Sequence, residues 1–336
     1  MSTNPKKNPT IYDVAKFSGV SISTISRFIN APEKVNTETR SRVSKAIDKL
    51  GFIPKAEARA RALRQTGRIG VVTPFFTAPS FVQRLRGIAG ALSKERYELV
   101  IYTVESAEHL KSYMASLPLT GNLDGLVIMS LPIGETDACR LLDHNIPTVL
   151  IEYPNPILSS VEIDDAAGGK MATEYLIKKG HQRIAFLGDT DLLEYSIHPV
   201  SMRLAGFRQA MQEAGLPVQE EFIRLAPYTQ EQTRQAASEL LGQPNAPTAL
   251  FAATDFQALG VLKAARQLGI RVPEQLAVIG FDDLDMAEYA DLTTVCQYLD
   301  ESGRLAIEIL LSRIVDPSRP AQHIHIPLTI IKRATA

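Results

Sequence analysis

One short helical segment carries side chains that could contact nucleic acid. Four of its residues fall at spacings that share one side of a helix: Ile22, Ser23, Ser26 and Arg27. Together they offer methyl, hydroxyl and guanidinium groups, which suit base edges and phosphates in a DNA groove. An apolar side of the same segment, with Val20, Ile25 and Phe28, would face a core. The segment therefore predicts a recognition helix, if a second helix positions it.

The residues before this segment supply that second helix. Thr10 with Asp13 three residues later is typical of a capping box at a helix start. Gly19 tolerates the positive φ of a helix end, and Ser21 can cap the helix that follows. An ordinary helical hairpin is the alternative. Because these features coincide with the polar outer side, we interpret residues 10–30 as a helix-turn-helix.

Charge is divided unevenly along the chain. Residues 1–64 carry thirteen Lys or Arg and five Asp or Glu, a net of +8, whereas the remainder has a net of −9. The alternative is that these charges only keep an exposed helix in contact with water. A basic head on a mildly acidic body nevertheless favours a nucleic-acid-binding module joined to a part that binds something else.

A third helix and a connecting segment complete the head. Asn36 can cap a helix in which Val43, Ala46, Ile47 and Leu50 recur at helical spacing. The Ala- and Arg-rich stretch after Pro54 is too short to persist as an isolated helix, so we expect it to order only against a partner.

From Arg68 onward, short apolar runs alternate with helical segments, which predicts parallel α/β sheets. There are too many such runs for one ordinary sheet, so we expect two similar halves with a cleft between them. Ligands in such folds bind at the carboxyl ends of strands. The residues there are Pro74 to Phe76, Glu152, Asp189, Thr254 with Asp255, and Asp282 with Asp283.

The chain resembles the lactose-repressor (LacI/GalR) family of bacterial transcription regulators over nearly its whole length. The similar segments, in the family's order, are IYDVAKFSGVSISTISRFIN, LGFIP, DGLVIMS, KKGHQRIAFLGD, SMRLAGF, ATDFQALG and VIGFDD. The resemblance implies a small all-α helix-turn-helix head (1–53), a hinge helix and linker (54–67), and an α/β core like periplasmic-binding proteins (68–336). It places residues 68–165 and 296–326 in one parallel-sheet subdomain, and 166–295 with the C-terminal strand in the other.

The resemblance also implies partners. It predicts a homodimer on a pseudo-palindromic double-stranded DNA operator, and a small effector, most simply a carbohydrate, bound between the subdomains. The residues matching base-reading positions are Ile22, Ser23 and Arg27. Arg27 is the best candidate for bidentate contact with guanine. Those matching phosphate-contacting or positioning sites are Tyr12, Ser21, Thr24 and Asn30.

The hinge departs from the family's pattern. The family commonly places a leucine about seven residues after the hinge proline, where it enters the minor groove. Here Leu63 lies nine residues after Pro54, and Arg61 occupies the expected position. Either the chain absorbs two residues so that Leu63 remains the wedge, which we favour, or Arg61 enters the groove electrostatically.

In the core, Arg203 and Asp282 match the pair that grips the effector. A guanidinium fork and a carboxylate can satisfy a sugar's hydroxyls, while aromatic faces cover its C–H side. Candidates for those faces, for which core packing is the alternative, are Phe75, Phe76, Phe81 and Tyr228. Other candidate pocket residues are Ser80, Glu152, Asp164 and Thr254. Thr254 stands where sugar-responsive members commonly have Asn, and we expect Asp255 to cap the following helix.

Other chemistries find little support. Cys139 and Cys296 lack metal or disulfide spacing, and we expect both to be buried. His323 and His325 share one strand face without an evident third ligand. We expect no cofactor and no metal. An α/β enzyme or a transport-type binding protein with an attached head stays as an alternative. Without an apolar leader or span, we expect a cytoplasmic protein that does not enter a membrane.

Overall fold

The computed structural model describes residues 9–30, 34–50, 52, 66–190 and 193–336. The chain forms two compact units, Met1–Thr66 and Gly67–Ala336. We describe each by itself and call them the head and the core.

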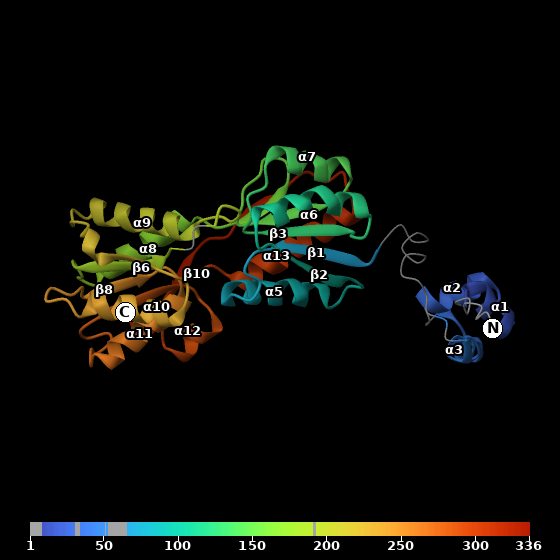
Figure 1. Cartoon of the computed structure of the whole chain (residues 1–336), viewed down its shortest axis with the longest axis horizontal. Coiled ribbons are helices and arrows are strands. Elements are labelled where there is room, and N and C mark those ends of the chain that lie inside the picture. Colours follow the sequence, from blue (N-terminus) through green and yellow to red (C-terminus); the bar gives the residue numbers. More distant parts are fainter. Residues whose placement is uncertain (1–8, 31–33, 51, 53–65, 191–192) are drawn as a thin grey trace, which may run out of the picture. The chain divides into compact units, whose positions relative to one another are not determined.

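The described part of the head consists of helices (Figure 1). They pack around four fully buried side chains. The helices are α1 (Ile11–Ser18), α2 (Ile22–Asn30) and α3 (Thr37–Leu50). The buried residues are Val14, Ile25, Val43 and Ala46. So few apolar residues make a small core, which is expected to gain stability from a partner.

The predicted caps of the head helices are confirmed. The backbone N–H of Thr10 donates to Asp13 Oδ2 at 2.7 Å, and Gly19 ends α1 with a φ of +66°. Thr39 N donates to Asn36 Oδ1 at 2.8 Å at the start of α3. Arg42 on α3 donates to the carbonyl of Ser18 at 2.7 Å, so it ties α3 to the turn between α1 and α2.

The first core sheet has the strand order β11-β5-β4-β3-β1-β2, and all its pairings are parallel. Its strands are β1 (Arg68–Thr73), β2 (Glu98–Thr103), β3 (Gly125–Met129), β4 (Thr148–Ile151), β5 (Ser159–Glu162) and β11 (His323–His325). One face packs on α5 (Pro79–Leu92) and α13 (Leu299–Val315), and the other on α6 (Ala107–Thr120) and α7 (Glu135–Asp143) (Figure 1). We call this the first subdomain.

The second sheet has the order β12-β10-β9-β8-β6-β7. Its strands are β6 (Ile184–Asp189), β7 (Ile223–Ala226), β8 (Ala249–Ala252), β9 (Ala277–Asp282), β10 (Thr293–Cys296) and β12 (Thr329–Ile331). Helices α8 (Asp165–Lys178) and α9 (Pro199–Glu213) cover one face, and α10 (Gln230–Leu241) and α11 (Asp255–Gln267) the other (Figure 1). The short η2 (Glu220–Phe222) and α12 (Asp285–Tyr289) complete this second subdomain.

The chain passes between the subdomains three times. It crosses between β5 and α8, again between β10 and α13, and finally between β11 and β12. Each subdomain is therefore built from separated stretches of sequence.

The predicted α/β core of two parallel-sheet subdomains is confirmed, and the edge strand β12 adds one antiparallel pairing with β10 to the second sheet. The expectation that both cysteines are buried was wrong in part. Cys296 is buried, but Cys139 is exposed because its position on α7 faces away from the sheet, whose side is taken by Ala138 and Leu141. Burial raises the pKa of the Cys296 thiol to about 12, so this thiol is inert.

Candidate functional site

The second head helix presents the predicted polar side to solvent. Ile22 is 39% exposed, and Ser23 and Arg27 are also exposed, while Ile25 on the same helix is fully buried. Ser21 Oγ lies 2.8 Å from Ser23 Oγ and 2.8 Å from Thr24 Oγ1. These hydroxyl contacts stabilise the start of α2. The side chain of Arg27, further along the helix, is exposed to solvent.

The predicted backbone-contacting residues are placed in part. Tyr12 on α1 is 69% exposed, an unusual degree for an aromatic side chain with no partner surface. Ser21 is exposed and Thr24 half-buried. The side chain of Asn30 and the hinge residues Arg61 and Leu63 lie outside the described residues.

The core contains a pocket of about 320 Å³ between the two subdomains. In the first sheet the strand order reverses between β1 and β3, and in the second between β6 and β8. Residues at or just after the carboxyl ends of all four strands line the pocket: Phe75, Ser130, Asp189 and Thr254. Both sheets thus direct their switch points, where ligands bind in such folds, at one cavity.

Eight of the ten residues that we predicted for the effector line this pocket: Phe75, Ser80, Phe81, Glu152, Arg203, Tyr228, Thr254 and Asp282. Phe76 does not line it, and its side chain is 40% exposed. Asp164 does not either, because its carboxylate caps α8 by accepting from Ala167 N at 2.8 Å.

A buried arginine from the first subdomain organises one wall. Arg84 on α5 is 2% exposed and donates through Nη2 to Glu152 Oε1 at 2.5 Å. Its Nε donates to Ser302 Oγ at 2.9 Å, while Ser130 Oγ donates to the other carboxylate oxygen of Glu152. Burial alone would raise the pKa of Glu152, but the charge of Arg84 and the two hydrogen bonds outweigh it and lower that pKa.

A second buried arginine organises the opposite wall. Arg203 on α9 donates to Asp165 Oδ1 at 2.8 Å and to the carbonyl of Ala253 at 2.7 Å, and its guanidinium lies 3.6 Å from the ring centroid of Phe281. Its Nη1 is 3.5 Å from Asp282 Oδ1. These contacts fix the orientation of the Arg203 guanidinium group in the absence of a ligand.

Asp282 is the least satisfied polar group in the pocket. Gln297 Nε2 donates to its Oδ1 at 2.5 Å, but the buried Oδ2 has no hydrogen-bond partner among the described residues. Burial raises the pKa of Asp282 to about 7. A buried acceptor without a donor costs free energy, which a ligand can recover by donating to it.

Glycines set the position of both arginines. A Cβ at Gly303 of α13 would lie 2.3 Å from the carbonyl oxygen of Arg84, and one at Gly169 of α8 would lie 2.1 Å from that of Arg203. Only the missing side chains allow these helices to pack so closely. The two subdomains thus hold their arginines by the same device.

The pocket also concentrates unusual backbone. Four of its lining residues have positive φ although none is glycine: Phe75, Ser130, Glu152 and Asp282. Such conformations cost about 1–3 kcal/mol each and persist where function requires the geometry. All four follow or end a strand at the pocket.

The expectation for Asp255 was wrong. Thr254 caps α11 instead, with its hydroxyl accepting from Gln257 N at 3.2 Å. Asp255 is fully buried and accepts from Leu284 N at 2.8 Å and from Thr294 Oγ1 at 2.5 Å. It therefore ties the start of α11 to the loop after β9 and to β10.

Sequence reasoning missed several lining residues: Ala78, Arg84, Ser130, Ser196, Ile197, His198, Pro199, Val200 and Gln297. Arg84 could have been found, because it follows Ser80 by four positions and so shares its helix face. Gln297 directly follows a strand that the alternation did not reveal. The residues of the loop before α9 follow no sequence pattern that would predict their place in the pocket.

An arginine outside the pocket bridges the subdomains. Arg86 on α5 donates to both oxygens of Asp285 on α12, at 2.5 and 3.1 Å, and to both oxygens of Asp300 on α13, at 2.7 and 2.6 Å. Asp285 belongs to the second subdomain. This cluster therefore spans the cleft beside the pocket.

His323 Nδ1 lies 2.9 Å from Ser160 Oγ, and within the described ranges no three His, Cys, Asp or Glu side chains are grouped to hold a metal ion. Among the helices that the structure describes, none is long and apolar enough to cross a membrane.

Comparison with known proteins extends these observations. Residues 10–55 match the model of bacterial regulatory proteins of the lacI family, and residues 173–336 match a periplasmic binding protein-like domain. The ribose operon repressor of Escherichia coli (strain K12) is 32% identical over 332 residues, which are 97% of this chain and 99% of that protein. Catabolite control protein A of Priestia megaterium is 33% identical over 90% of this chain and 92% of its own.

Solved structures agree. The lac repressor bound to ONPG in the repressed state superposes with a TM-score of 0.80 at 28% identity, covering 98% of this chain and 100% of that one. The complex of the transcriptional regulator CelR with cellobiose gives 0.68 at 29% identity, with 98% and 100% covered.

A helix-turn-helix head on a two-subdomain α/β core with a central pocket defines a DNA-binding transcription regulator. This chain belongs to the LacI family of bacterial regulatory proteins. Its relatives are transcriptional regulators rather than enzymes.

Proposed function

We propose that this protein controls transcription by binding a pseudo-palindromic operator as a homodimer, and that a carbohydrate in the core pocket changes its affinity for that operator. The observation that carries the proposal is the pocket itself, where Arg203 and the unpaired oxygen of Asp282 converge from the second subdomain. Hydroxyl groups both donate and accept, so they suit this pair.

The aromatic side chains of the pocket support a carbohydrate. Phe75 and Phe81 meet edge to face with ring centroids 5.9 Å apart, and Tyr228 stacks on Phe256 at 4.9 Å. Rings held in this way offer fixed apolar faces for the C–H side of a sugar. The relatives include a ribose operon repressor and a regulator solved with cellobiose.

On DNA, we assign base reading to Ile22, Ser23 and Arg27 and backbone contacts to Tyr12, Ser21, Thr24 and Asn30. We divide the chain into the head (1–53), the hinge (54–67) and the core (68–336), with Leu63 as the minor-groove wedge and Arg61 as the alternative. The protein has no catalytic role under this proposal. It acts in the cytoplasm, at the nucleoid when bound to DNA.

The test begins with selection of operator sequences from a random DNA library by the full chain. Binding to the selected site is then measured by fluorescence anisotropy with and without a panel of sugars. A sugar that changes the operator affinity of the wild type should have no effect on Arg203→Ala or Asp282→Asn, which should still bind DNA. If both variants respond as the wild type does, the effector site is elsewhere.

A further inference from the structure

The pocket contains most of what an anion site needs. Two arginines, Arg84 and Arg203, lie in its walls. The first turns of α5 and α9 also line it, and neither Ala78 nor His198, which precede these helices, caps them with a side chain. Free backbone N–H groups at a helix start favour anions. By these features alone the pocket would take a phosphate.

Each arginine, however, is already neutralised by a carboxylate of the chain. Arg84 is paired with Glu152 at 2.5 Å and Arg203 with Asp165 at 2.8 Å. All four side chains are at most 15% exposed, so solvent screens these pairs weakly. No positive charge is left over from either pair.

Asp282 then adds a third carboxyl group that no arginine fully pairs, and this group carries its negative charge above its raised pKa of about 7. Its Oδ1 lies 3.5 Å from Arg203, beyond normal hydrogen-bond length, and its Oδ2 has no partner in the described part of the chain. Three buried carboxyl groups therefore face two guanidinium groups, so the pocket has no excess positive charge below about pH 7 and a net negative charge above it. An anionic ligand would find no free cation at the lower pH and net repulsion at the higher pH, whereas a hydroxyl could donate to Asp282 and accept from the helix starts.

We propose that the Arg84–Glu152 pair is a specificity element that makes the pocket reject anions, so that the effector is an uncharged, hydroxyl-rich molecule and not a sugar phosphate or a sugar acid. This inference rests on the proposed function and narrows its ligand class. Glu152 is central to this exclusion because it accepts hydrogen bonds from both Arg84 and Ser130. Its carboxylate occupies the place that an anion would take.

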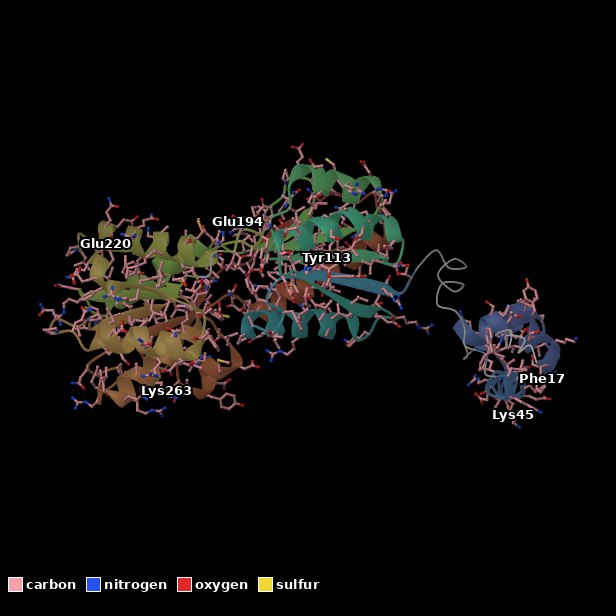
Figure 2. The ribbon with its side chains drawn as sticks, viewed as in Figure 1. Phe17, Lys45, Tyr113, Glu194, Glu220 and Lys263 are labelled. Carbon is pink, nitrogen blue, oxygen red and sulfur yellow. The ribbon has the colours of Figure 1, made fainter. Side chains whose placement is uncertain are left out.

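The test uses the full chain and inorganic phosphate as a probe, with chloride keeping the ionic strength constant. Phosphate should leave the Tm of the wild type unchanged. In Glu152→Gln it should raise the Tm by roughly 5 °C, because the freed Arg84 and the first turn of α5 then form an anion site. Glu220→Gln is the matched control, since Glu220 pairs with Arg208 at the surface, away from the pocket (Figure 2).

A second variant keeps the test decisive if Glu152→Gln does not fold. Asp165→Asn frees Arg203 from its paired carboxylate at the other wall and should also gain a phosphate-dependent rise in Tm. Stabilisation of the wild type by phosphate would overturn the inference. So would the absence of any gain in the folded variants.

A comparison of uncharged sugars with charged sugar derivatives tests the chemical class of the effector directly. Ribose, glucose and cellobiose are compared with ribose 5-phosphate, glucose 6-phosphate and glucuronate as stabilisers of the wild type. At least one uncharged sugar should raise the Tm, and no charged one should. Stabilisation by charged members only, or by none of the set, would overturn the inference. A neutral sugar that raises the Tm but leaves operator affinity unchanged would instead contradict the proposed function.

Discussion

Arg84 and Glu152 form an ion pair within the first subdomain, where Nη2 lies 2.5 Å from Oε1 at exposures of 2% and 11%. Arg84 comes from α5, and Glu152 directly follows β4. The pair therefore joins a covering helix to the carboxyl end of the sheet at the pocket wall. We therefore expect its loss to change both stability and ligand choice.

Arg84→Met should destabilise the core by about 3–5 kcal/mol, because it leaves the Glu152 carboxylate buried without its counter-ion. The double variant Arg84→Met with Glu152→Gln should recover much of this loss, since no unpaired charge remains. Urea unfolding of both single variants and the double variant measures the coupling. Additive effects would mean that the two side chains do not interact in solution.

The Arg86 cluster should hold the subdomains together. Arg86→Ala should open the cleft at low salt, and high salt should bring the wild type towards the variant, because these exposed ion pairs are screened. Cys139 is exposed and Cys296 buried, so one label on Cys139 and one on a Lys263→Cys variant report the opening by energy transfer. Lys263 lies on α11 of the second subdomain (Figure 2).

The matched control for that measurement is Arg208→Ala. Arg208 pairs with Glu220 inside the second subdomain, so its loss should not change the distance between the labels. Equal transfer efficiency in wild type and Arg86→Ala at low salt would show that the cluster does not hold the cleft.

Asp282 should make stability depend on pH. Burial raises its pKa to about 7, so the folded state holds a proton that the unfolded state has released at lower pH. This contribution to stability is present below the unfolded pKa and is lost as pH rises towards about 7. The stability of Asp282→Asn relative to wild type should therefore increase between about pH 5 and about pH 7 and then level off, with a slope of at most about 1.4 kcal/mol per pH unit. A flat difference would place the pKa at its ordinary value.

Arg27→Ala should weaken binding to the selected operator and relax base preference at one position, at a cost of about 1–3 kcal/mol of discrimination. Lys45→Ala is the control, because Lys45 is an exposed cation on α3 rather than α2 (Figure 2). Anisotropy titrations compare specific with random DNA. Equal loss on both by Arg27→Ala would assign Arg27 to phosphate.

Local patterns predicted the fold well because caps and periodicity are local. The Thr10–Asp13 capping box, Gly19 and the Asn36 cap all lie where the sequence placed them. The pocket was harder. Arg203 and Asp282 lie in recognisable segments, but Arg84 is defined by its pairing with Glu152, 68 residues away. Its spacing from Ser80 places it on the same helix face, but that spacing does not reveal that the arginine is buried and paired.

The three chain crossings have a consequence for how the protein is made. Helix α13, which covers the face of the first sheet with Ala306, Ile307 and Leu310, is synthesised after almost all of the second subdomain. Strand β11 follows later still, so the first subdomain, although it begins to emerge before the second, is completed only just before β12 completes the second sheet. Until then its apolar sheet face and the edge of β5 stay uncovered, as aggregation-prone surfaces of a nascent chain. Chaperone demand during synthesis should therefore fall on the first subdomain, and truncation before Leu299 should leave both sheets unfinished.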